Sequence, residues 1–478
     1  MALAFNPYLP SYEYIPDGEP HIFGDRIYIY GSHDKFNSND FCYNDHVCWS
    51  CPIDDLSAWR YEGVIFKRTD DPHNRSGRSP LYAPDACQGP DGKYYLYYFA
   101  AYHNEIGVAV CDTPCGQFKP IGYVHHADGT PLGRKKGDGF AFDPGVYVEG
   151  DKVYLYTGFG PVHYPFTRGK QSKEGATCCH LDKDMMTIIG EPTILAKVKR
   201  NGQGTEWEGH EFFEAASMRK INGKYYFIYS SFLGHELCYA TSDYPDKDFK
   251  FGGTLISIGD VGLRDHKDVK TAANFTGNTH GSILTIGDKH YVFYHRQTNR
   301  HCFSRQACAE EIKIEADGSI KQAEVTSCGL NGGPLPLPGK YGFYIACTLT
   351  CPQGGVFYMP FKGMKGKRPF FTQTGKDRED NPDQYIANFT DGCVAGFKYF
   401  ASEGKEKEVS ILLSGKGKGE LVIYADDPKA PLATLPVDIA TKERTLIKGE
   451  WKGIEGTIAL HVAYRGKGAL DLFEIEIA

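Results

Sequence analysis

The sequence predicts an all-β protein in which a five-bladed β-propeller is followed by a β-sandwich. The main observation is a short aromatic strand that recurs at residues 23–34, 91–101, 149–160, 222–232 and 286–296. Each copy begins with a turn that contains glycine and a charged residue. It then alternates aromatic or β-branched residues as a half-buried strand does. The copies are roughly 60 to 70 residues apart, which suits a four-stranded blade with its turns.

Composition agrees with this fold class and narrows the function. Aromatic residues make up 14% of the chain, and 55 glycines and 27 prolines favour short strands joined by tight turns. No apolar run approaches the roughly 20 residues that a membrane span needs. The net charge is −7, and basic residues cluster only in short loops. Nucleic acid and anionic membranes are therefore poor candidate partners, whereas a neutral substrate fits.

The N-terminal segment and the cysteines predict the compartment. The first residues lack the basic region and apolar core of a signal peptide, and the 15 cysteines are odd in number and scattered. In a chain of this length they are typical of reduced core thiols, so we expect a cytoplasmic protein. The pair Cys48 and Cys51 has no second pair at zinc-site spacing, which argues against a structural zinc.

The strand repeat orders the first part of the chain into blades. We expect the second blade at residues 82–127, the third from residue 138, the fourth around residues 207–232 and the fifth at residues 280–326. Two polar loops, 67–81 and 161–176, lie between the predicted strands. The second of these carries the aromatics His163, Tyr164 and Phe166, which can reach over the mouth of the central channel.

Composition shifts where the propeller is expected to end. Residues 329–339 read GLNGGPLPLPG, and their glycines and prolines exclude both helix and central strand. Beyond them, alternating stretches such as EVSILLS, GELVIYAD and TIALHVAY are typical of sandwich strands. We therefore expect a propeller at 1–328, a linker at 329–339 and a β-sandwich at 340–478.

A second regularity concerns function. A polar residue lies about ten to twelve positions before the aromatic strand of each blade; in order these residues are Asp17, Asp85, Asp143, Glu214 and His280. A strand and a hairpin turn fill this interval, so each polar residue would begin the strand before the repeat. If that strand is the innermost one, the five side chains meet at one mouth of the channel. The alternative is that they are turn residues that cap strands, which suits Asp85 best.

Acidic side chains that converge in one pocket can cleave a glycosidic bond. One carboxylic acid protonates the leaving oxygen, and a carboxylate activates a water on the far side of the ring. Glu214 is surrounded by Phe and Ala residues, which favours its protonated form, whereas Asp17 lies in a Pro- and Gly-rich turn and should stay ionised. Asp143 would raise the pKa of Glu214. His280 is a charge partner, a substrate contact or a metal ligand, or else a hydrogen-bonded histidine of the channel.

Several segments resemble family 43 of the glycoside hydrolases, over roughly residues 5–325. These segments are NPYLPSYEYIPDGEPHIF, YAPD, FDPGVYV, FFEAASMRKINGKYYFIYSS and NTHGSI. The resemblance implies a five-bladed propeller that inverts anomeric configuration, with Asp17 as general base, Asp143 as pKa modulator and Glu214 as general acid. Tyr82 replaces a Trp of the family pattern. Ala215-Ala216 replaces Gly-Pro, which weakens the assignment of Glu214.

Two further points depend on the resemblance. Glu19 is an alternative to Asp17 as the base, because both precede the strand HIF. The NTHGSI segment implies that His280 faces a calcium ion, through water, or a water cluster in the channel. That calcium would be structural or electrostatic, and the chemistry itself requires no cofactor.

Aromatic and basic side chains complete the expected site. A neutral sugar packs its C–H faces on aromatic rings, and guanidinium groups reach its hydroxyls. Our candidate substrate contacts are Asp85, Phe36, Trp207, Phe213, His280 and Arg305. The C-terminal part resembles the family 6 carbohydrate-binding modules, through YIANFTDGCVAGFKYF, Trp451 and GKGALDLFEIEI. We expect this part to pack on the propeller rather than to bind glycan.

These observations predict an inverting exo-glycosidase. Its partner is an oligosaccharide, from which it releases α-L-arabinofuranosyl or β-D-xylosyl units of plant hemicellulose or pectin. One alternative is an endo-acting arabinanase or xylanase, which needs an open groove where the loops 67–81 and 161–176 predict a blocked pocket. The other is a non-catalytic sugar-binding propeller, against which the three carboxylates argue. The sequence does not determine the oligomeric state.

Overall fold

The computed structural model describes residues 3–101, 104–162, 172–358, 368–379 and 381–478. Within these ranges, five antiparallel sheets form the blades of a propeller. Blades 1 and 2 consist of β1 (Glu19–Phe23), β2 (Arg26–Tyr30), β3 (His46–Pro52), β4 (Arg60–Phe66), β5 (Leu81–Gln88), β6 (Tyr94–Ala100), β7 (Ile106–Cys111) and β8 (Lys119–Tyr123). A short 3₁₀-helix, η1 (Arg68–Asp70), lies in the loop between them.

The remaining blades follow in chain order. Blade 3 consists of β10 (Gly145–Glu149), β11 (Lys152–Thr157), β12 (Ala176–Leu181) and β13 (Thr187–Ala196), with β9 (His125–His126) parallel to its outer edge. Blades 4 and 5 consist of β14 (Phe212–Ile221), β15 (Lys224–Ser231), β16 (Glu236–Ser242), β17 (Lys250–Ser257), β18 (Ile283–Ile286), β19 (Lys289–Thr298) and β20 (His301–Ile312).

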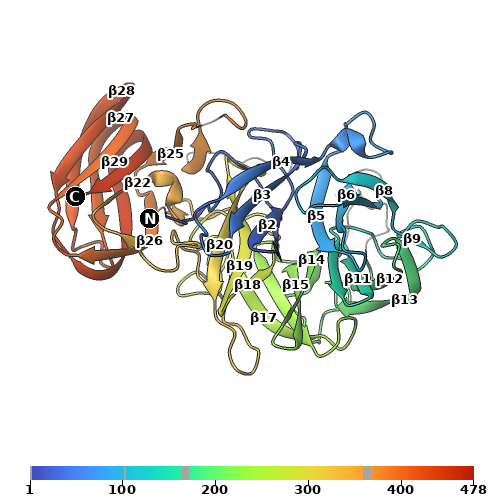
Figure 1. Cartoon of the computed structure of the whole chain (residues 1–478). Coiled ribbons are helices and arrows are strands. Elements are labelled where there is room, and N and C mark those ends of the chain that lie inside the picture. The colour runs from blue at the N-terminus through green and yellow to red at the C-terminus, as the bar shows by residue number, and fades with distance from the viewer. Residues whose placement is uncertain (1–2, 102–103, 163–171, 359–367, 380) are drawn as a thin grey trace.

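The first strand of each blade faces the centre of the ring. β1 contacts β5, β5 contacts β10, β10 contacts β14, β14 contacts β18, and β18 contacts β1 again, so the ring is closed. The repeated aromatic strand is the second strand of every blade, and its side chains pack between neighbouring sheets. The predicted five-bladed propeller is therefore confirmed (Figure 1).

Blade 5 has three strands in the described part of the chain, and the N-terminal segment lies along its outer edge. The Tyr8 N–H donates to the carbonyl of Ala307 (3.3 Å), and the Asn6 N–H donates to the carbonyl of Ser327 (3.0 Å). The Asn6 side chain both donates to and accepts from the backbone of Ala309 (2.9 Å each). The bonds to Ala307 and Ala309 satisfy edge groups of β20 that would otherwise be left unpaired.

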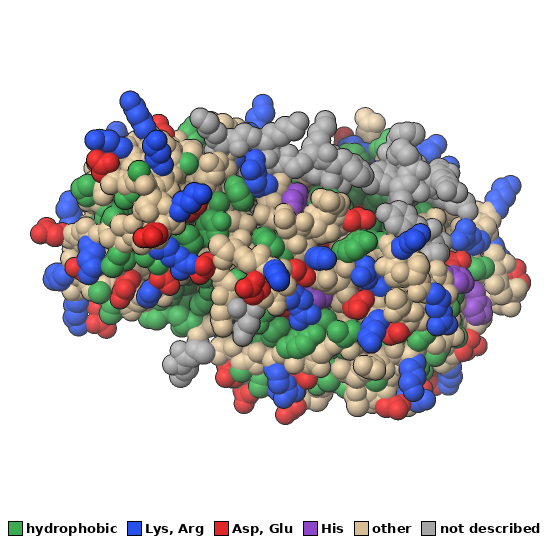
Figure 2. All heavy atoms as spheres, turned by 90° about the horizontal axis from the view of Figure 1, so that it is seen from above, with side chains coloured by type: hydrophobic (Ala, Val, Ile, Leu, Met, Phe, Trp, Pro, Cys, Tyr) green, Lys and Arg blue, Asp and Glu red, His purple; other side chains and the backbone are tan. Residues whose placement is uncertain are grey.

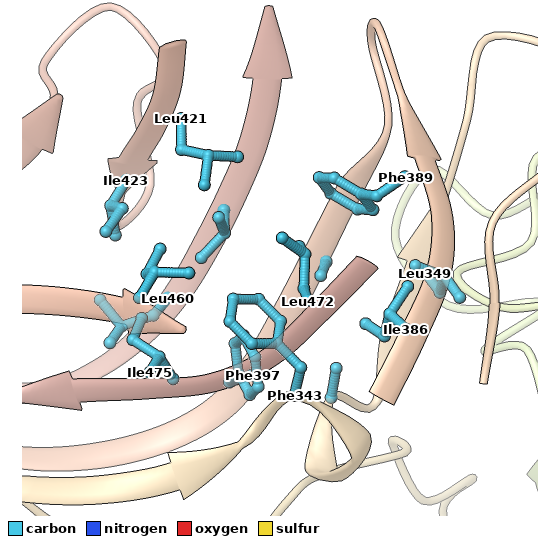
Figure 3. Close-up of a cluster of buried hydrophobic side chains, with 14 of the residues drawn as sticks. Phe343, Leu349, Ile386, Phe389, Phe397, Leu421, Ile423, Leu460, Leu472 and Ile475 are labelled. Atoms are coloured by element: carbon cyan, nitrogen blue, oxygen red, sulfur yellow. The ribbon is translucent and has the colours of Figure 1, made fainter. Parts of the chain in front are cut away.

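A β-sandwich-like domain follows the propeller. Its elements are β21 (Leu335–Pro336), β22 (Gly339–Gly342), η3 (Phe343–Ile345), β23 (Thr348–Thr350), β24 (Phe370–Gln373), β25 (Gln384–Thr390), β26 (Val394–Glu403), β27 (Glu408–Tyr424), β28 (Ala433–Glu450) and β29 (Glu455–Ile477). β21 already pairs with β26, so this sheet begins within residues 329–339. Side chains from both faces form its core, among them Phe343, Phe397 and Leu472 (Figure 3).

Buried ion pairs and hydrogen bonds hold the two domains together. The Lys398 ammonium on β26 lies 2.9 Å from a carboxylate oxygen of Asp260 and 2.9 Å from one of Glu324. Arg296 of β19 donates to the carbonyls of Tyr344 (2.6 Å) and Ala346 (3.0 Å). Both basic side chains are about 5% exposed or less. The C-terminal domain therefore packs directly on blade 5 and its flanking loops (Figure 1).

Charged groups are mixed on the surface. On the face seen in Figure 2, Lys and Arg side chains alternate with Asp and Glu over both domains. Among the described residues, no helix has the length and hydropathy needed to cross a membrane.

The junction generates a stability prediction. Lys398→Met removes the ammonium and leaves the buried carboxylate of Asp260 without its cation, whereas the half-buried Glu324 still pairs with Arg264, so we expect the free energy of unfolding to fall by about 3 kcal/mol. Lys448→Met is the matched control, because its 2.6 Å pair with Glu408 is exposed and should contribute less than about 1 kcal/mol. Urea denaturation of both variants measures the difference. Equal losses in the two variants would contradict the role of the junction.

Candidate active site

A cavity of about 590 Å³ opens where the innermost strands begin. Its lining includes seven of the residues singled out from the sequence: Asp17, Tyr82, Asp143, Phe213, Glu214, His280 and Arg305. Asp17, Asp143 and His280 come directly before β1, β10 and β18, and Glu214 is the third residue of β14. The same end of four blades therefore supplies the titratable groups, and the expected convergence is observed for these residues.

The backbone is bent at the three acidic residues. Asp17 and Asp143 have φ angles of 59° and 47°, and Ala215, next to Glu214, has a φ of 67°. The pairing of β14 with β15 shifts register on both sides of Glu214, so this residue lies in a β-bulge. A bulge redirects a side chain out of the regular alternation. Glu214 thereby points into the cavity, although Phe212 and Ala216 of the same strand belong to the core.

Gly145 explains how Asp143 comes close to Glu214. A Cβ at this glycine would lie 2.1 Å from the carbonyl oxygen of Ala216, so a side chain here would force β10 away from β14. The close approach lets the Ala215 N–H donate to Asp143 Oδ2 (3.2 Å). The FDPG motif therefore needs its glycine to place one carboxyl beside the next blade.

Asp17 is held as a carboxylate. Its Oδ1 lies 3.0 Å from Arg305 Nη1 and 3.4 Å from His295 Nδ1. Arg305 also donates twice to Asp34, through Nε (2.9 Å) and Nη2 (2.9 Å). Burial alone would raise the pKa of Asp17, but the positive charge of Arg305 and the polar His295 outweigh it, so the pKa lies below the usual 3.8.

Glu214 and Asp143 are shifted in the opposite direction. Burial among apolar side chains raises the pKa of Glu214 well above 4.5, and the negative charge of Asp143 adds to this. Burial also raises the pKa of Asp143, which His280 partly offsets. Glu214 is half-buried, so its carboxyl remains accessible from the cavity. The site thus holds one carboxyl group with a lowered pKa, Asp17, and two with raised pKa values, Glu214 and Asp143.

His280 lies between two carboxylates. Its Nδ1 is 3.7 Å from Asp143 Oδ2, and its Nε2 is 3.7 Å from Glu19 Oε1. Burial lowers the pKa of this imidazole, but Glu19 and the other acids raise it by more than burial lowers it. The pKa therefore lies at about 9. Glu19 in turn pairs with Arg219 (2.6 Å), which helps to lower its pKa to about 2 against the effect of burial. Glu19 is not among the described residues that line the cavity.

Three expected substrate contacts are corrected, because the described lining of the cavity does not include them. Asp85 is fully buried within β5, where its carboxylate accepts from the Val146 N–H (2.7 Å) and lies 2.7 Å from His21 Nε2. Phe36 stacks on Tyr14 outside the cavity (5.4 Å between ring centroids). Trp207 is in the core of blade 4. The loop aromatics at 163–166 lie outside the described residues.

The sequence analysis did not identify several residues of the site. Asp34 holds Arg305 in place, and His295 contacts Asp17. In the sequence, Asp34 and His295 were visible only as parts of the strand repeat. Phe41, Phe142, Phe159, Phe232 and Phe303 add apolar walls to the cavity. Nothing in their local patterns separates them from core phenylalanines. A pocket with apolar walls and with carboxyl groups whose pKa values are shifted in opposite directions is suited to acid–base cleavage of a glycosidic bond.

The family model for glycosyl hydrolases family 43 matches residues 23–320. The chain belongs to this family. It is therefore a glycoside hydrolase, and its family match covers the blades that carry Asp143, Glu214 and His280.

Relatives extend the similarity beyond the propeller. A xylosidase/arabinosidase of Thermoclostridium stercorarium is 49% identical over 470 residues, which cover 98% of this chain and 97% of the relative. A family 43 β-xylosidase/α-arabinofuranosidase from a compost microbial metagenome, solved with xylotriose, is 26% identical over 68% of this chain and 98% of that one, with a TM-score of 0.51. A family 43 arabinoxylan arabinofuranohydrolase of Bacillus subtilis, solved with cellotetraose, covers 99% of this chain and 97% of its own at 20% identity. Its TM-score of 0.51 supports a common fold alone.

The position of Asp85 yields a second prediction. Asp85→Ala removes a buried acceptor that joins blade 2 to blade 3, so the free energy of unfolding should fall by about 2 to 4 kcal/mol. Because this side chain is not among the described residues that line the cavity, KM should stay within about twofold of the parent well below the melting temperature. Thermal denaturation and steady-state kinetics measure the two effects. A large rise in KM with unchanged stability would restore Asp85 as a substrate contact.

Proposed function

We propose that this family 43 enzyme is an inverting exo-glycosidase that releases α-L-arabinofuranosyl or β-D-xylosyl units from oligosaccharides of plant hemicellulose or pectin. The observation that carries the proposal is that one cavity is lined both by Asp17, which is paired with Arg305, and by Glu214, which lies in a bulge beside Phe213. The xylosidase/arabinosidase name of the relative that is 49% identical supports the two sugars. The small, aromatic-lined cavity is consistent with attack at a chain end rather than within a polymer.

Each carboxyl has a distinct role in this proposal. Asp17 takes a proton from a water molecule, which attacks the anomeric carbon from the face opposite to the leaving group. Glu214 gives its proton to the glycosidic oxygen as the bond to the leaving sugar breaks. Asp143 keeps the pKa of Glu214 high and orients the bulge at Ala215. Arg305 keeps Asp17 ionised. Phe213, His280 and Arg305, which line the cavity, are proposed to contact substrate.

The roles of acid and base are tested by changing the leaving group. Glu214→Ala should lower kcat on an arabinosyl or xylosyl disaccharide by about 10²- to 10⁴-fold. The loss should be much smaller on the matching nitrophenyl glycoside, because nitrophenolate departs with little help from an acid. Asp17→Ala should lower both rates to a similar degree, since water must be activated in either case. Steady-state kinetics on the two substrates measure the contrast.

Glu19→Gln is the control for the base assignment. It replaces the other candidate base, which pairs with Arg219 and Ser217 in the channel. We expect it to retain more activity than Asp17→Ala. A greater loss in Glu19→Gln than in a folded Asp17→Ala would move the base to Glu19. The anomer formed first, read by proton NMR, tests inversion.

The raised pKa of Glu214 predicts a shift in the pH profile. An acid works in its protonated form, so kcat/KM falls as pH rises through the pKa of Glu214. Asp143→Asn removes a negative charge that raises this pKa, so the alkaline limb should move to lower pH. The acidic limb, which reports Asp17, should move less. An alkaline limb that stays in place would contradict the proposed role of Asp143.

Calcium is proposed as structural and not as part of the chemistry. Glu19 Oε1 is buried and lacks a hydrogen-bond partner among the described residues, and it faces His280, so this oxygen is available to a cation when the imidazole of His280 is neutral. The carboxylate of Asp85 is already used by Val146 and His21. Calcium takes six to eight oxygen ligands. An ion here would therefore be held largely through water beside His280 and Glu19.

Removal of divalent ions tests this proposal. We expect a chelator to lower the melting temperature by a few degrees, because RT ln(1 + [L]/Kd) of stabilisation is lost. More than half of kcat should remain, because the carboxyl groups carry the reaction. Loss of nearly all activity that calcium restores would give the ion a role in the chemistry.

The C-terminal domain is proposed to serve the propeller rather than to act as a separate glycan-binding module. Its resemblance to the family 6 modules gives the sandwich class, and the buried contacts of Lys398 and Arg296 support tight packing. To test for a second site, a form of the protein whose cavity is blocked by a bound sugar is titrated with xylan and arabinan fragments.

A further inference from the structure

The C-terminal domain supplies part of the wall of the catalytic cavity. Phe357 and Tyr358 line it together with the acids, although they lie beyond β23 (Thr348–Thr350) of the sandwich. Phe357 is half-buried, whereas Tyr358 is 2% exposed and stacks on Phe275 (6.0 Å between ring centroids). The ring of Phe357 is therefore more exposed in the cavity than the ring of Tyr358.

Backbone hydrogen bonds fix this segment against blades 4 and 5. The Thr276 N–H donates to the carbonyl of Val356 (3.0 Å), and the Tyr358 N–H donates to the carbonyl of Thr276 (2.6 Å). Thr276 and Phe357 thus form a parallel bridge. The loop that contains Thr276 continues to Asn278 and His280, which both line the cavity. The position of Phe357 is consequently tied to the strand ends that form the site.

The ring of Phe357 lies over the turn that joins β15 to β16. A Cβ at Gly234 in this turn would come within 2.8 Å of Phe357 Cζ, so the absence of a side chain there makes room for the ring. The neighbouring Phe232 also lines the cavity and lies 6.2 Å from Phe213, measured between ring centroids. The turn follows β15, whose residue Ser230 pairs with Glu214.

The two sides of the cavity are therefore different. Arg305 and Asp17 occupy one side with Phe41 and Phe303, and the Arg305 guanidinium lies over the Phe41 ring (4.9 Å). Glu214 lies beside Phe213 in β14, Phe213 contacts Phe232, and Phe357 lies against the turn at Gly234 that follows Phe232, so we place these three rings on the side of Glu214. A general acid must reach the glycosidic oxygen, so the leaving sugar extends on the side of Glu214.

We propose that Phe357 of the C-terminal domain contacts the leaving-group sugar, so that this domain completes the substrate site of the propeller. The inference rests on the proposed function, because the side of the leaving group follows from Glu214 as the acid. An aromatic ring packs on the C–H face of a sugar, and such a contact with a partly buried ring changes affinity by about 10-fold or more. The C-terminal domain then selects what the propeller cleaves.

The contrast between two substrates tests the contact. Phe357→Ala should raise KM for an arabinosyl or xylosyl disaccharide about tenfold and leave kcat within about threefold. KM for the glycosyl fluoride of the same sugar should stay within twofold, because this substrate has no leaving sugar. Phe357→Tyr should restore the low KM, and Phe357→Leu should restore part of it. Tyr385→Ala is the matched control, since this half-buried aromatic of the same domain stacks on Phe473 outside the cavity.

Binding without turnover separates this inference from the proposed reaction. In a Glu214→Ala background, calorimetry should find weaker binding of the disaccharide, but not of the monosaccharide, when Phe357→Ala is added. A parent that binds these sugars without cleaving them would refute the proposed hydrolysis and still measure the contact. Unchanged disaccharide affinity and KM in a folded Phe357→Ala, or an equal rise of KM for disaccharide and fluoride, would overturn the contact. If neither the Glu214→Ala protein nor its Phe357→Ala derivative binds the sugars, both the proposed hydrolysis and the proposed contact would be overturned.

Discussion

The buried guanidinium of Arg305 joins the last blade of the propeller to the first and keeps Asp17 in the cavity ionised. It projects from β20 in the last blade and bonds to Asp34 and Asp17, which flank the innermost hairpin of the first blade. The side chain is 1% exposed, so these charge-assisted bonds act in surroundings of low polarity. Closure of the ring and ionisation of Asp17 depend on the same group. A change here would affect the fold and the chemistry together.

On the opposite side of the cavity, the raised pKa of Glu214 depends on the lack of a neighbouring guanidinium group among the described residues. Glu214 lies in a bulge among aromatic rings, and the neighbouring Asp143 adds a second acid rather than a cation. Two carboxyl groups in one cavity therefore have pKa values shifted in opposite directions. The two pKa values differ because blade 5 supplies the guanidinium of Arg305 beside Asp17, whereas blade 4 supplies Phe213 beside Glu214. The backbone at Asp17, Asp143 and Ala215 has positive φ angles, a form of local strain that is common at functional sites and that the surrounding contacts must offset.

The position of the C-terminal domain also has a functional meaning. Its junction is held by buried charged groups such as Lys398 and by backbone bonds to Thr276, and not by a flexible tether. Contacts of this kind fix one orientation of the two domains. The C-terminal domain thereby holds Phe357 and Tyr358 in the wall of the cavity.

The sequence by itself determined the all-β class, the five blades and the identity of the carboxyl groups in the cavity. It did so because a strand repeat of period two and its glycine turns are local signals, and because charged residues among apolar ones are conspicuous. Asp17, Asp143 and Glu214 were found from their constant spacing before the repeated strand, and Arg305 was predicted only as a substrate contact that follows the fifth copy. Only the tertiary structure decided that Asp85, Phe36 and Trp207 face elsewhere, that Asp34 and His295 support Asp17, and that Phe357 reaches the cavity from another domain. These facts depend on contacts between segments far apart in the chain, and a local pattern carries no information about which of two faces a phenylalanine or an aspartate will meet.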